Sequence, residues 1–426
     1  MNATAVWLLL LPLLAGSLGA RDFYLSPTGA GQRDGSSWEN AFESKKLGTV
    51  VNETLQPGDR LLLAGGTYSG TQLVIDRGGE RGKPKIIEGV DHGQGLPIFN
   101  SQWSIEDPAK GATAIEFKAG VSEVTFKHLR LHGYAVGVYA APVKTGTART
   151  HLVFDDVDIE HCRHGFYLSD CDDLELQNCD LRRYSKHGFR FELGCNRVRL
   201  QGCVADCSAG DAEWEKKTEL FPFGFLLNDA GAPNTAFVFT ECIARNNLMP
   251  LQTTSYKNGD GFVVEENSAN VVFERCRSLR NQDGGFDLKV RDVRLTDCVS
   301  SGNYRDYRIW TTATLTNCFA GWATTGLWCN GGPVEVRRST FHQLKDEAVR
   351  TDKSATLPVT LSDCIISATD KPADQRVAGE VVLRETIVVS GADSDPQYIR
   401  PAAGWDGSGD AMNSQAFPAK GYQRSK

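Results

Sequence analysis

The chain has 426 residues, of which 23% are charged, and a formal net charge of −7 at pH 7. This acidic balance argues against non-specific binding to nucleic acid, whose phosphates attract basic surfaces. Beyond the N-terminus, no apolar run approaches the roughly 20 residues of a membrane-spanning helix, so we expect neither a nucleic-acid partner nor a membrane span.

The N-terminus has the pattern of a secretory signal. An apolar run from Val6 to Leu14 precedes the small residues AGSLGA and the charged residues Arg21 and Asp22. The run is too short to cross a bilayer. We therefore expect residues 1–20 to be a signal peptide, and the protein to be secreted, periplasmic or bound to the cell surface. The alternative is a buried first strand.

Residues 21–90 are expected to form an N-terminal cap and the first strands. Within them, the span from 40 to 55 is consistent with a short amphipathic helix. A cap is required in a stack of repeats, because each repeat covers only its neighbours and the terminal ones would expose apolar surface.

Residues 91–390 contain an internal repeat centred on cysteine. The repeated phrase reads QNCDL, QGCVA, TECIA, ERCRS, TDCVS, TNCFA and SDCII, with central cysteines 24, 39, 34, 22, 20 and 46 residues apart. The last spacing spans two repeats, because RRSTF has Thr340 in the cysteine position. A period near 22 with alternating apolar residues is typical of stacked strands. We predict an all-β fold, a single-stranded right-handed parallel β-helix of about ten rungs.

A second phrase recurs in step with the first, as HGFYL, HGFRF, FGFLL, DGFVV, GGFDL and RDYRI. Side chains alternate between the two faces of a strand, so its aromatic residues are expected to stack inward. Rungs are ~4.8 Å apart, so neighbouring outward residues are close enough to share a ligand. The expected outward line is Tyr167, Arg190, Leu226, Val263, Asp287 and Arg308.

The chain has 12 cysteines, which in an exported protein usually indicate disulfides. Here seven recur at one repeat position, where small buried apolar side chains are needed. We therefore predict a ladder that is mostly reduced and structural. Pairs between Cys203 and Cys207, or between Cys171 and Cys195, are the alternatives outside this pattern.

Asp260, Asp283 and Asp287 lie in two consecutive repeats, where stacking would bring them to one face. Converging carboxylates are typical ligands of a divalent cation. Nearby basic residues supply local charge for an anionic sugar polymer, although for each one taken alone a solvated surface position is the favoured interpretation. These residues are Arg275, Arg277, Arg280, Lys289, Arg291, Arg294, Arg305 and Arg308.

Two further features bear on a binding groove. His164 and His187 occupy the repeat position of Asp260, either as a substrate-contacting pair or as a stacked turn ladder. The segments 211–222 and 246–258 enlarge two repeats, and loops of this kind commonly wall a cleft. The candidates for stacking on sugar rings are Trp214, Tyr256, Tyr304, Trp310 and Trp328.

Two motifs carry a family resemblance, the DGF at 260–262 and the NQDGGFDL at 281–288. This region resembles polysaccharide lyase family 9, its pectate lyases in particular. The N-terminal phrases DFYLSPTGAGQRDGSSWENAF and LQPGDRLLLAGGTYSG resemble the first part of many right-handed parallel β-helix proteins.

The resemblance implies a calcium ion held by four aspartates. Asp260, Asp283 and Asp287 match three of them, and Gly284 stands in the fourth position. The family also has a lysine base in a later rung, where this chain has Arg308. The chain therefore departs from the family pattern at one metal ligand and at the base.

We therefore predict a lyase that cleaves a uronic-acid polymer by calcium-assisted β-elimination, with Ca2+ on the three aspartates neutralising the substrate carboxylate. Arg308 or Lys289 is the expected base. Lys289 is the rival because it follows Asp287 by two residues and shares its strand face; a site without a base is the third option. Two other functions remain open, a glycoside hydrolase or epimerase that uses the aspartates without metal, and a non-catalytic carbohydrate-binding protein. We expect a monomer with a C-terminal tail at 391–426.

Overall fold

The computed structural model describes residues 19–143, 147–228, 230–251, 258–352, 358–369, 371–372, 375–388 and 422. The predicted signal segment lies outside these ranges, except for its last two residues, as does most of the predicted tail. Within these ranges, no helix has the length and apolar character that a membrane crossing requires.

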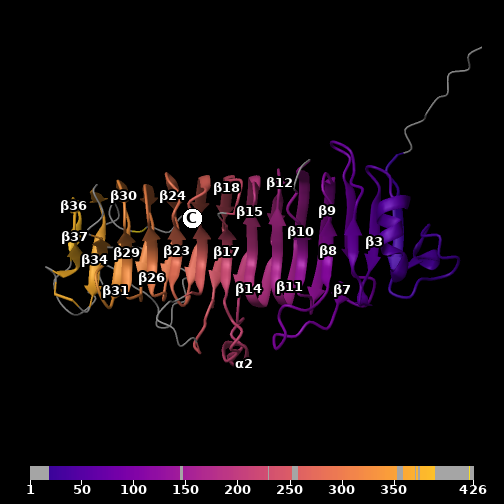
Figure 1. Ribbon diagram of the computed structural model, residues 1–426, viewed down its shortest axis with the longest axis horizontal. Coiled ribbons are helices and arrows are strands. Elements are labelled where there is room, and N and C mark those ends of the chain that lie inside the picture. Colours follow the sequence, from indigo (N-terminus) through magenta and orange to yellow (C-terminus); the bar gives the residue numbers. More distant parts are fainter. Residues whose placement is uncertain are drawn as a thin grey trace, which may run out of the picture.

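The described chain forms a parallel β-helix, in which strands from successive repeats stack along one long axis (Figure 1). The strands pair in parallel, in three ladders. The predicted all-β class and stacked-strand architecture are therefore confirmed. The long strands β9 (Ser122–His132), β11 (Arg149–Ser169) and β14 (Asp180–Glu192) each contribute to more than one ladder.

Ladder 1 carries the second repeated phrase and is completed by the C-terminal parts of β11 and β14. Its other strands are β5 (Leu73–Ile75), β8 (Thr113–Phe117), β10 (Val136–Ala140), β17 (Phe223–Leu227), β20 (Asp260–Val264), β23 (Gly284–Leu288), β26 (Arg305–Ile309), β29 (Thr325–Cys329), β32 (Val349–Thr351) and β35 (Val377–Ala378).

Ladders 2 and 3 form the rest of the helix wall. Ladder 2 contains β1 (Asp22–Ser26), β3 (Arg60–Ala64), β6 (Lys85–Val90), β13 (Glu175–Gln177), β15 (Asn196–Gln201), β18 (Asn234–Thr240), β21 (Ser268–Glu274), β24 (Val293–Thr296), β27 (Ala313–Thr316), β30 (Val334–Arg337), β33 (Val359–Ser362) and β36 (Val381–Arg384), with β2 (Phe42–Glu43) and β12 (Cys171–Asp172) alongside. Ladder 3 contains β4 (Gly66–Ser69), β7 (Pro97–Asn100), β16 (Val204–Asp206), β19 (Ile243–Arg245), β22 (Arg277–Leu279), β25 (Val299–Ser301), β28 (Phe319–Gly321), β31 (Thr340–Leu344), β34 (Ile365–Thr369) and β37 (Ile387–Val388).

The cysteine phrase marks the corner between ladders 2 and 3. The residue before each cysteine has a positive φ, which turns the chain at the corner. The cysteine then points inward, and the thiol of Cys276 lies 3.4 Å from the carbonyl oxygen of Phe239 in the preceding rung. All 12 cysteines are free and buried, so the predicted reduced ladder is confirmed and neither alternative pair forms. The corner residues are Asn178, Gly202, Glu241, Arg275, Asp297, Asn317 and Asp363.

The predicted inward aromatic stack fills the interior behind ladder 1. Phe225 and Phe262 stack with their ring centres 4.7 Å apart, and Phe262 and Phe286 follow at 4.8 Å. Tyr307 continues the stack at 5.3 Å from Phe286. All four side chains are buried, so this column keeps the rungs of ladder 1 in register.

Helical segments are short and lie outside the three ladders. The span predicted to be helical contains η2 (Ser44–Lys46), α1 (Leu47–Thr49) and η3 (Val50–Thr54), at the indigo end of Figure 1. The other helical elements among the described residues are η1 (Trp38–Asn40) and α2 (Ala212–Glu215), and α2 lies in the expanded repeat at 211–222.

Candidate active site

The predicted outward residues lie side by side on ladder 1. Asp287 pairs with Val263 on one side and with Arg308 on the other, and Arg308 pairs with Trp328. A pocket of about 450 Å³ lies over these strands, at the middle of the predicted line. Its lining residues are Phe223, Asn258, Asp260, Val263, Glu265, Asp283, Asp287, Lys289, Tyr304, Arg305, Arg308 and Trp310.

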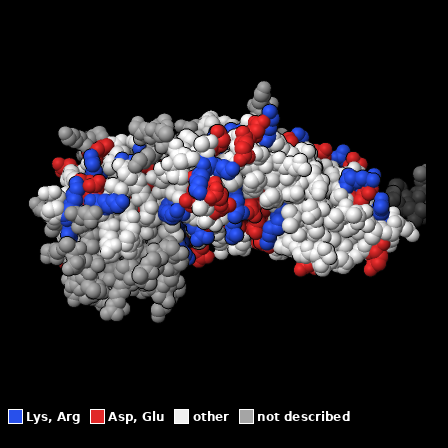
Figure 2. Space-filling model, turned by 90° about the horizontal axis from the view of Figure 1, so that it is seen from below, with Lys and Arg blue, Asp and Glu red and all other residues white. Residues whose placement is uncertain are grey.

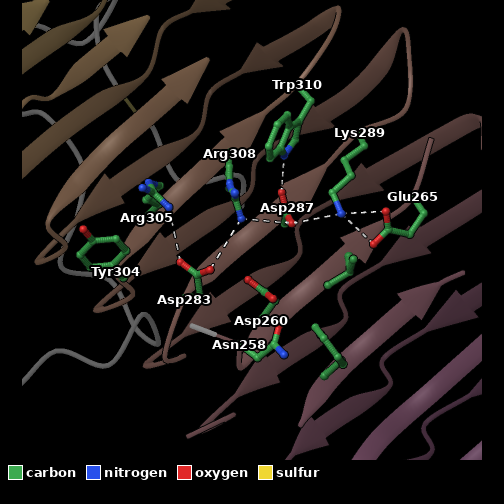
Figure 3. Close-up of a pocket in the computed structure, with 12 residues that line it drawn as sticks. Asn258, Asp260, Glu265, Asp283, Asp287, Lys289, Tyr304, Arg305, Arg308 and Trp310 are labelled. Atoms are coloured by element: carbon green, nitrogen blue, oxygen red, sulfur yellow. Dashed lines mark hydrogen bonds and ion pairs between the residues drawn. The ribbon is translucent and has the colours of Figure 1, made fainter. Parts of the chain in front are cut away.

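The three predicted aspartates and Arg308 line this pocket together, and Arg308 contacts two of the aspartates, Asp283 and Asp287 (Figure 3). The Nη1 atom of Arg308 lies 3.6 Å from Oδ2 of Asp283 and 3.5 Å from Oδ2 of Asp287. Arg305 brings a second guanidinium, with Nη1 3.6 Å from Oδ1 of Asp283. The side chains of Asp283 and Asp287 are only 7% and 6% exposed, so water screens these ion pairs weakly.

Asp260 is tied to the backbone of the next rung. Its Oδ1 atom accepts a hydrogen bond of 2.6 Å from the N–H of Gly284. A Cβ atom at position 284 would lie 2.8 Å from that oxygen, so glycine leaves room for the carboxylate. Burial and the nearby charges of Asp287 and Asp283 raise the pKa of Asp260 well above its usual range. Asp260 is therefore suited to hold a proton.

Lys289 forms a second group of ion pairs at the edge of the pocket. Its Nζ atom lies 2.7 Å from each carboxylate oxygen of Glu265 and 3.8 Å from Oδ2 of Asp287. Burial alone would lower the pKa of Lys289, but the charges of Asp287 and Glu265 outweigh burial and raise it. Lys289 is therefore a cation at neutral pH in the free protein.

Two tryptophans restrict the position of Arg308. The guanidinium lies 4.7 Å from the ring centre of Trp310 and 5.5 Å from that of Trp328. The indole Nε1–H of Trp310 also donates a hydrogen bond of 2.6 Å to Oδ1 of Asp287. Cation–π contacts and carboxylates together hold the guanidinium in one place.

The remaining aromatic candidates differ in position. Tyr304 lines the pocket, and the guanidinium of Arg305 lies 4.9 Å from its ring centre. Trp214 is buried and packs edge-on against His161, away from the pocket lining. Tyr256 lies outside the described residues.

His164 and His187 pair on the neighbouring strands β11 and β14, outside the pocket lining, with their rings tilted by 42°. Their Nδ1 atoms lie 2.9 Å apart, and both side chains are buried. Burial lowers the pKa of each imidazole well below its usual range, so both are neutral at pH 7. Of the two alternatives for this pair, the structural ladder matches the structure, but the histidines lie in the strands β11 and β14 and not in turns as predicted.

A row of buried amides supports the turns that precede ladder 1. Asn247 donates to Oδ1 of Asn281 at 2.8 Å, and Asn281 donates to Oδ1 of Asn303 at 2.9 Å. Asn303 donates in turn to Oδ1 of Asp306 at 2.8 Å. These side chains hold the turns at a fixed spacing, and the turns carry Asp283 and Tyr304 into the pocket.

Glu265 is a pocket residue that our sequence analysis missed. The predicted outward line contains Val263, Asp287 and Arg308. A second outward line runs two residues further along each strand and contains Glu265, Lys289 and Trp310 on successive rungs. Extending the strand alternation by two residues would have placed Glu265 beside Lys289. Phe223 also lines the pocket, and the repeated phrase FGFLL already placed it at the position of Asp260, with which it pairs. Asn258 lines the pocket as well and had no recognisable signal.

The carboxylates do not match the predicted calcium site. In the described parts of the chain, no three His, Cys, Asp or Glu side chains are grouped to hold a metal ion. Oxygens of the three aspartates already face Arg308 Nη1, Trp310 Nε1 and the N–H of Gly284. Calcium requires about six to eight oxygen ligands, whereas a guanidinium reaches between two of the three carboxylates here.

The structure thus defines a parallel β-helix protein with an acid–guanidinium pocket on one ladder. No family model matches the chain, and no curated protein matches it in sequence. Among solved structures, it is similar to pectate lyase Pel9A, with a TM-score of 0.54 and 16% identity over 90% of this chain and 84% of that one. The predicted resemblance to polysaccharide lyase family 9 is confirmed at the level of the fold.

Two other solved structures share the fold. The catalytic unit of thermostable GH87 alpha-1,3-glucanase from Streptomyces thermodiastaticus strain HF3-3 has a TM-score of 0.52 and 12% identity, over 87% of this chain and 69% of that one. DFA-IIIase from Arthrobacter chlorophenolicus A6 without its lid has a TM-score of 0.51 and 9% identity, over 80% of this chain and 92% of that one. At identities this low, the similarity establishes a common architecture only. Any statement about the reaction has to be argued from the residues of the pocket.

Proposed function

We propose that the protein is a secreted polysaccharide lyase that cleaves a uronic-acid polymer by β-elimination in the pocket of ladder 1. The observation that carries this proposal is the set of three cations, Lys289, Arg305 and Arg308, held beside buried carboxylates on the outer face of a β-helix. The fold shared with pectate lyase Pel9A supports the same reaction class.

The first requirement of the reaction is a receptor for the uronate carboxylate. Arg305 and Arg308 present planar guanidinium groups, which suit paired hydrogen bonds to a carboxylate. Neutralising that carboxylate makes the neighbouring C5 proton more acidic, because charge accumulates on the carboxylate as the proton leaves.

Local charge matters here because the chain is acidic overall. Figure 2 shows basic and acidic side chains interspersed over the middle of the face seen from below, next to a largely uncharged area. An anionic polymer would therefore be recruited by particular cations and not by the net charge of −7.

The second requirement is a base for the C5 proton, and we assign it to Lys289. Arg308 is the weaker candidate, because arginine stays protonated in proteins and its guanidinium is already paired with the carboxylates of Asp283 and Asp287. Lysine has the lower intrinsic pKa, and burial opposes its charge. Because ion pairing raises the pKa of Lys289, the rate should increase with pH into the alkaline range.

The third requirement is a proton for the leaving oxygen, and Asp260 can supply it. Burial and neighbouring carboxylates favour its protonated form. In the complete step the C5–H and C4–O bonds break and a C4–C5 double bond forms. Lys289 accepts the C5 proton, and Asp260 donates a proton to the departing oxygen.

A glycoside hydrolase is the second candidate. The observation that favours it is the proximity of Asp260, suited to hold a proton, to the buried carboxylates of Asp283 and Asp287. Hydrolysis needs such an acid and a carboxylate base or nucleophile. The fold shared with the GH87 alpha-1,3-glucanase is compatible with this chemistry.

Product analysis separates the two reactions. Pectate, alginate and glycosaminoglycans are incubated with the protein across neutral and alkaline pH. Elimination gives an unsaturated product that absorbs in the near ultraviolet, and hydrolysis gives reducing ends without that absorbance. A binding protein gives neither product and still retards the polymer in an affinity gel.

Lys289→Ala should lower the elimination rate by about 10²–10⁴-fold, the usual contribution of a general base. Lys127→Ala is the matched control, because Lys127 is an ion-paired lysine on ladder 2, away from the pocket. Reducing ends without absorbance would reject the lyase in favour of the hydrolase. An unchanged rate in Lys289→Ala would reject the assigned base.

A further inference from the structure

The guanidinium of Arg308, a cation of the protein itself, occupies the position between Asp283 and Asp287. Arg308 Nη1 is nearly equidistant from the two carboxylates, at 3.6 and 3.5 Å. Both aspartates are buried and lie on consecutive segments, one in the turn before β23 and one within it. Such a pair of buried carboxylates would be strongly unfavourable without a positive charge nearby.

The charges of the pocket are already balanced. Four acidic side chains, Asp260, Asp283, Asp287 and Glu265, line it together with the three basic side chains of Lys289, Arg305 and Arg308. With a proton on Asp260 the formal sum is zero. A divalent ion at the aspartates would lie close to these cations, where water provides little screening.

Arg308 is also held where it is by groups other than the aspartates. The rings of Trp310 and Trp328 pack against its guanidinium, and Trp310 uses one oxygen of Asp287 for its own hydrogen bond. To admit a metal ion, Arg308 would have to leave both carboxylates and both rings. The arrangement therefore favours the guanidinium over a metal ion.

We infer that Arg308 replaces a divalent cation between Asp283 and Asp287, and that the pocket receives a sugar carboxylate without calcium. The binding of a sugar carboxylate rests on the proposed function. The replacement of a divalent cation by Arg308 depends on the free protein alone and can be tested without a substrate.

Terbium luminescence tests the metal part directly. Tb3+ uses the same kind of oxygen ligands as Ca2+, and an ion at Asp287 would lie beside the indole of Trp310, which sensitises its emission. The signal to be measured is the Tb3+ emission that is lost when calcium is added and is also lost in the variant Asp287→Asn. These two criteria exclude the emission of Tb3+ ions bound elsewhere on the protein.

The wild-type protein should give no such emission at Tb3+ concentrations on the order of 10⁻³ M, the range of weak extracellular calcium sites. In Arg308→Ala it should appear, with affinity increased by about 10²-fold or more because a neighbouring positive charge is removed. Arg350→Ala is the matched control: Arg350 pairs with Trp328 on the next rung and faces Glu347, and it should behave like wild type.

Two results would overturn the inference. One is Asp287-dependent emission from the wild-type protein. The other is the absence of emission from Arg308→Ala and also from the milder Arg308→Gln, with circular dichroism showing both variants folded.

If the polymers above yield no product, the proposed function fails while the terbium result stands. If products form, a chelator should change the wild-type rate by less than about twofold, because no metal is needed.

Discussion

At the scale of single residues, Asp306 shows how burial changes the pKa of a carboxyl group. It lies at the end of the amide row and is fully buried, with hydrogen bonds from Asn303 and Ser300. Burial raises its pKa to about 8, although these hydrogen bonds favour the charged form. The folded protein therefore holds a proton on Asp306 over a pH range in which the unfolded chain, with an ordinary pKa of about 3.9, has lost it.

Asp306→Asn should consequently alter the pH dependence of stability. Because the folded state binds the extra proton, the wild-type free energy of unfolding should fall as pH rises from about 4 to 8. The contribution from Asp306 is at most about 5 kcal/mol, from four pKa units at 1.36 kcal/mol each. Urea unfolding at pH 5 and pH 8 measures it.

The variant Asp306→Asn should lose less stability than wild type between these two pH values. Asp107→Asn serves as the control, because Asp107 is an exposed loop residue paired with Lys110. Equal losses of stability in wild type and Asp306→Asn would show that the Asp306 carboxyl is not protonated in the fold.

At the scale of elements, the aromatic stack inside ladder 1 influences the geometry of the pocket on the outer face of the same strands. Phe262 lies between Phe225 and Phe286 in the interior, and Asp287 lies next to Phe286 on the opposite face of β23. The spacing of the rings therefore helps to set the spacing of the pocket residues on the outer face.

Phe262→Ala should destabilise the protein by about 3–5 kcal/mol, the usual cost of removing a large ring from a packed core. The replacement leaves a cavity between two stacked rungs, and the rate in the pocket should fall along with stability. Thermal unfolding and product assays measure the two effects. Val74→Ala on β5 is the control, since Val74 is 40% exposed. A variant Phe262→Ala as stable as this control would contradict the role of the stack.

The corners explain why the cysteine repeat is so regular. A left-handed residue turns the chain, and the next side chain must be small, apolar and directed inward. Cysteine meets these conditions. At the equivalent corner in RRSTF, Ser339 and not the predicted Thr340 takes the cysteine position, because Thr340 pairs with Phe319. The buried hydroxyl of Ser339 is satisfied by a hydrogen bond of 3.0 Å to the carbonyl oxygen of Arg337. The repeat is therefore a packing element of the corner.

At the scale of the whole molecule, the column of thiols makes a prediction about redox behaviour. All 12 cysteines are buried as free thiols along the described helix. A thiol-reactive dye should label few or none in the native protein and 12 after denaturation without reductant. The unfolding temperature should not change when a reductant is added. Fewer than 12 labelled thiols in the denatured chain would reveal a disulfide and contradict this arrangement.

Much of the architecture could be predicted from the sequence because a stacked-strand fold repeats one local pattern. The alternation of faces placed Phe262 and Phe286 inside and Asp287 and Arg308 outside, and the structure confirms this register. The convergence of Asp260, Asp283 and Asp287 followed from the same period. These features depend on strand spacing alone, which is nearly constant.

The partners of the charged side chains were decided only by the tertiary structure. Strand spacing places Arg308 beside Asp287, but it does not determine that the guanidinium also reaches Asp283, or that Trp310 and Trp328 hold it there. A long side chain has many conformations, and the contacts around it select one. For that reason the sequence determined where the acidic cluster lies, and the packed structure determined that a guanidinium balances it.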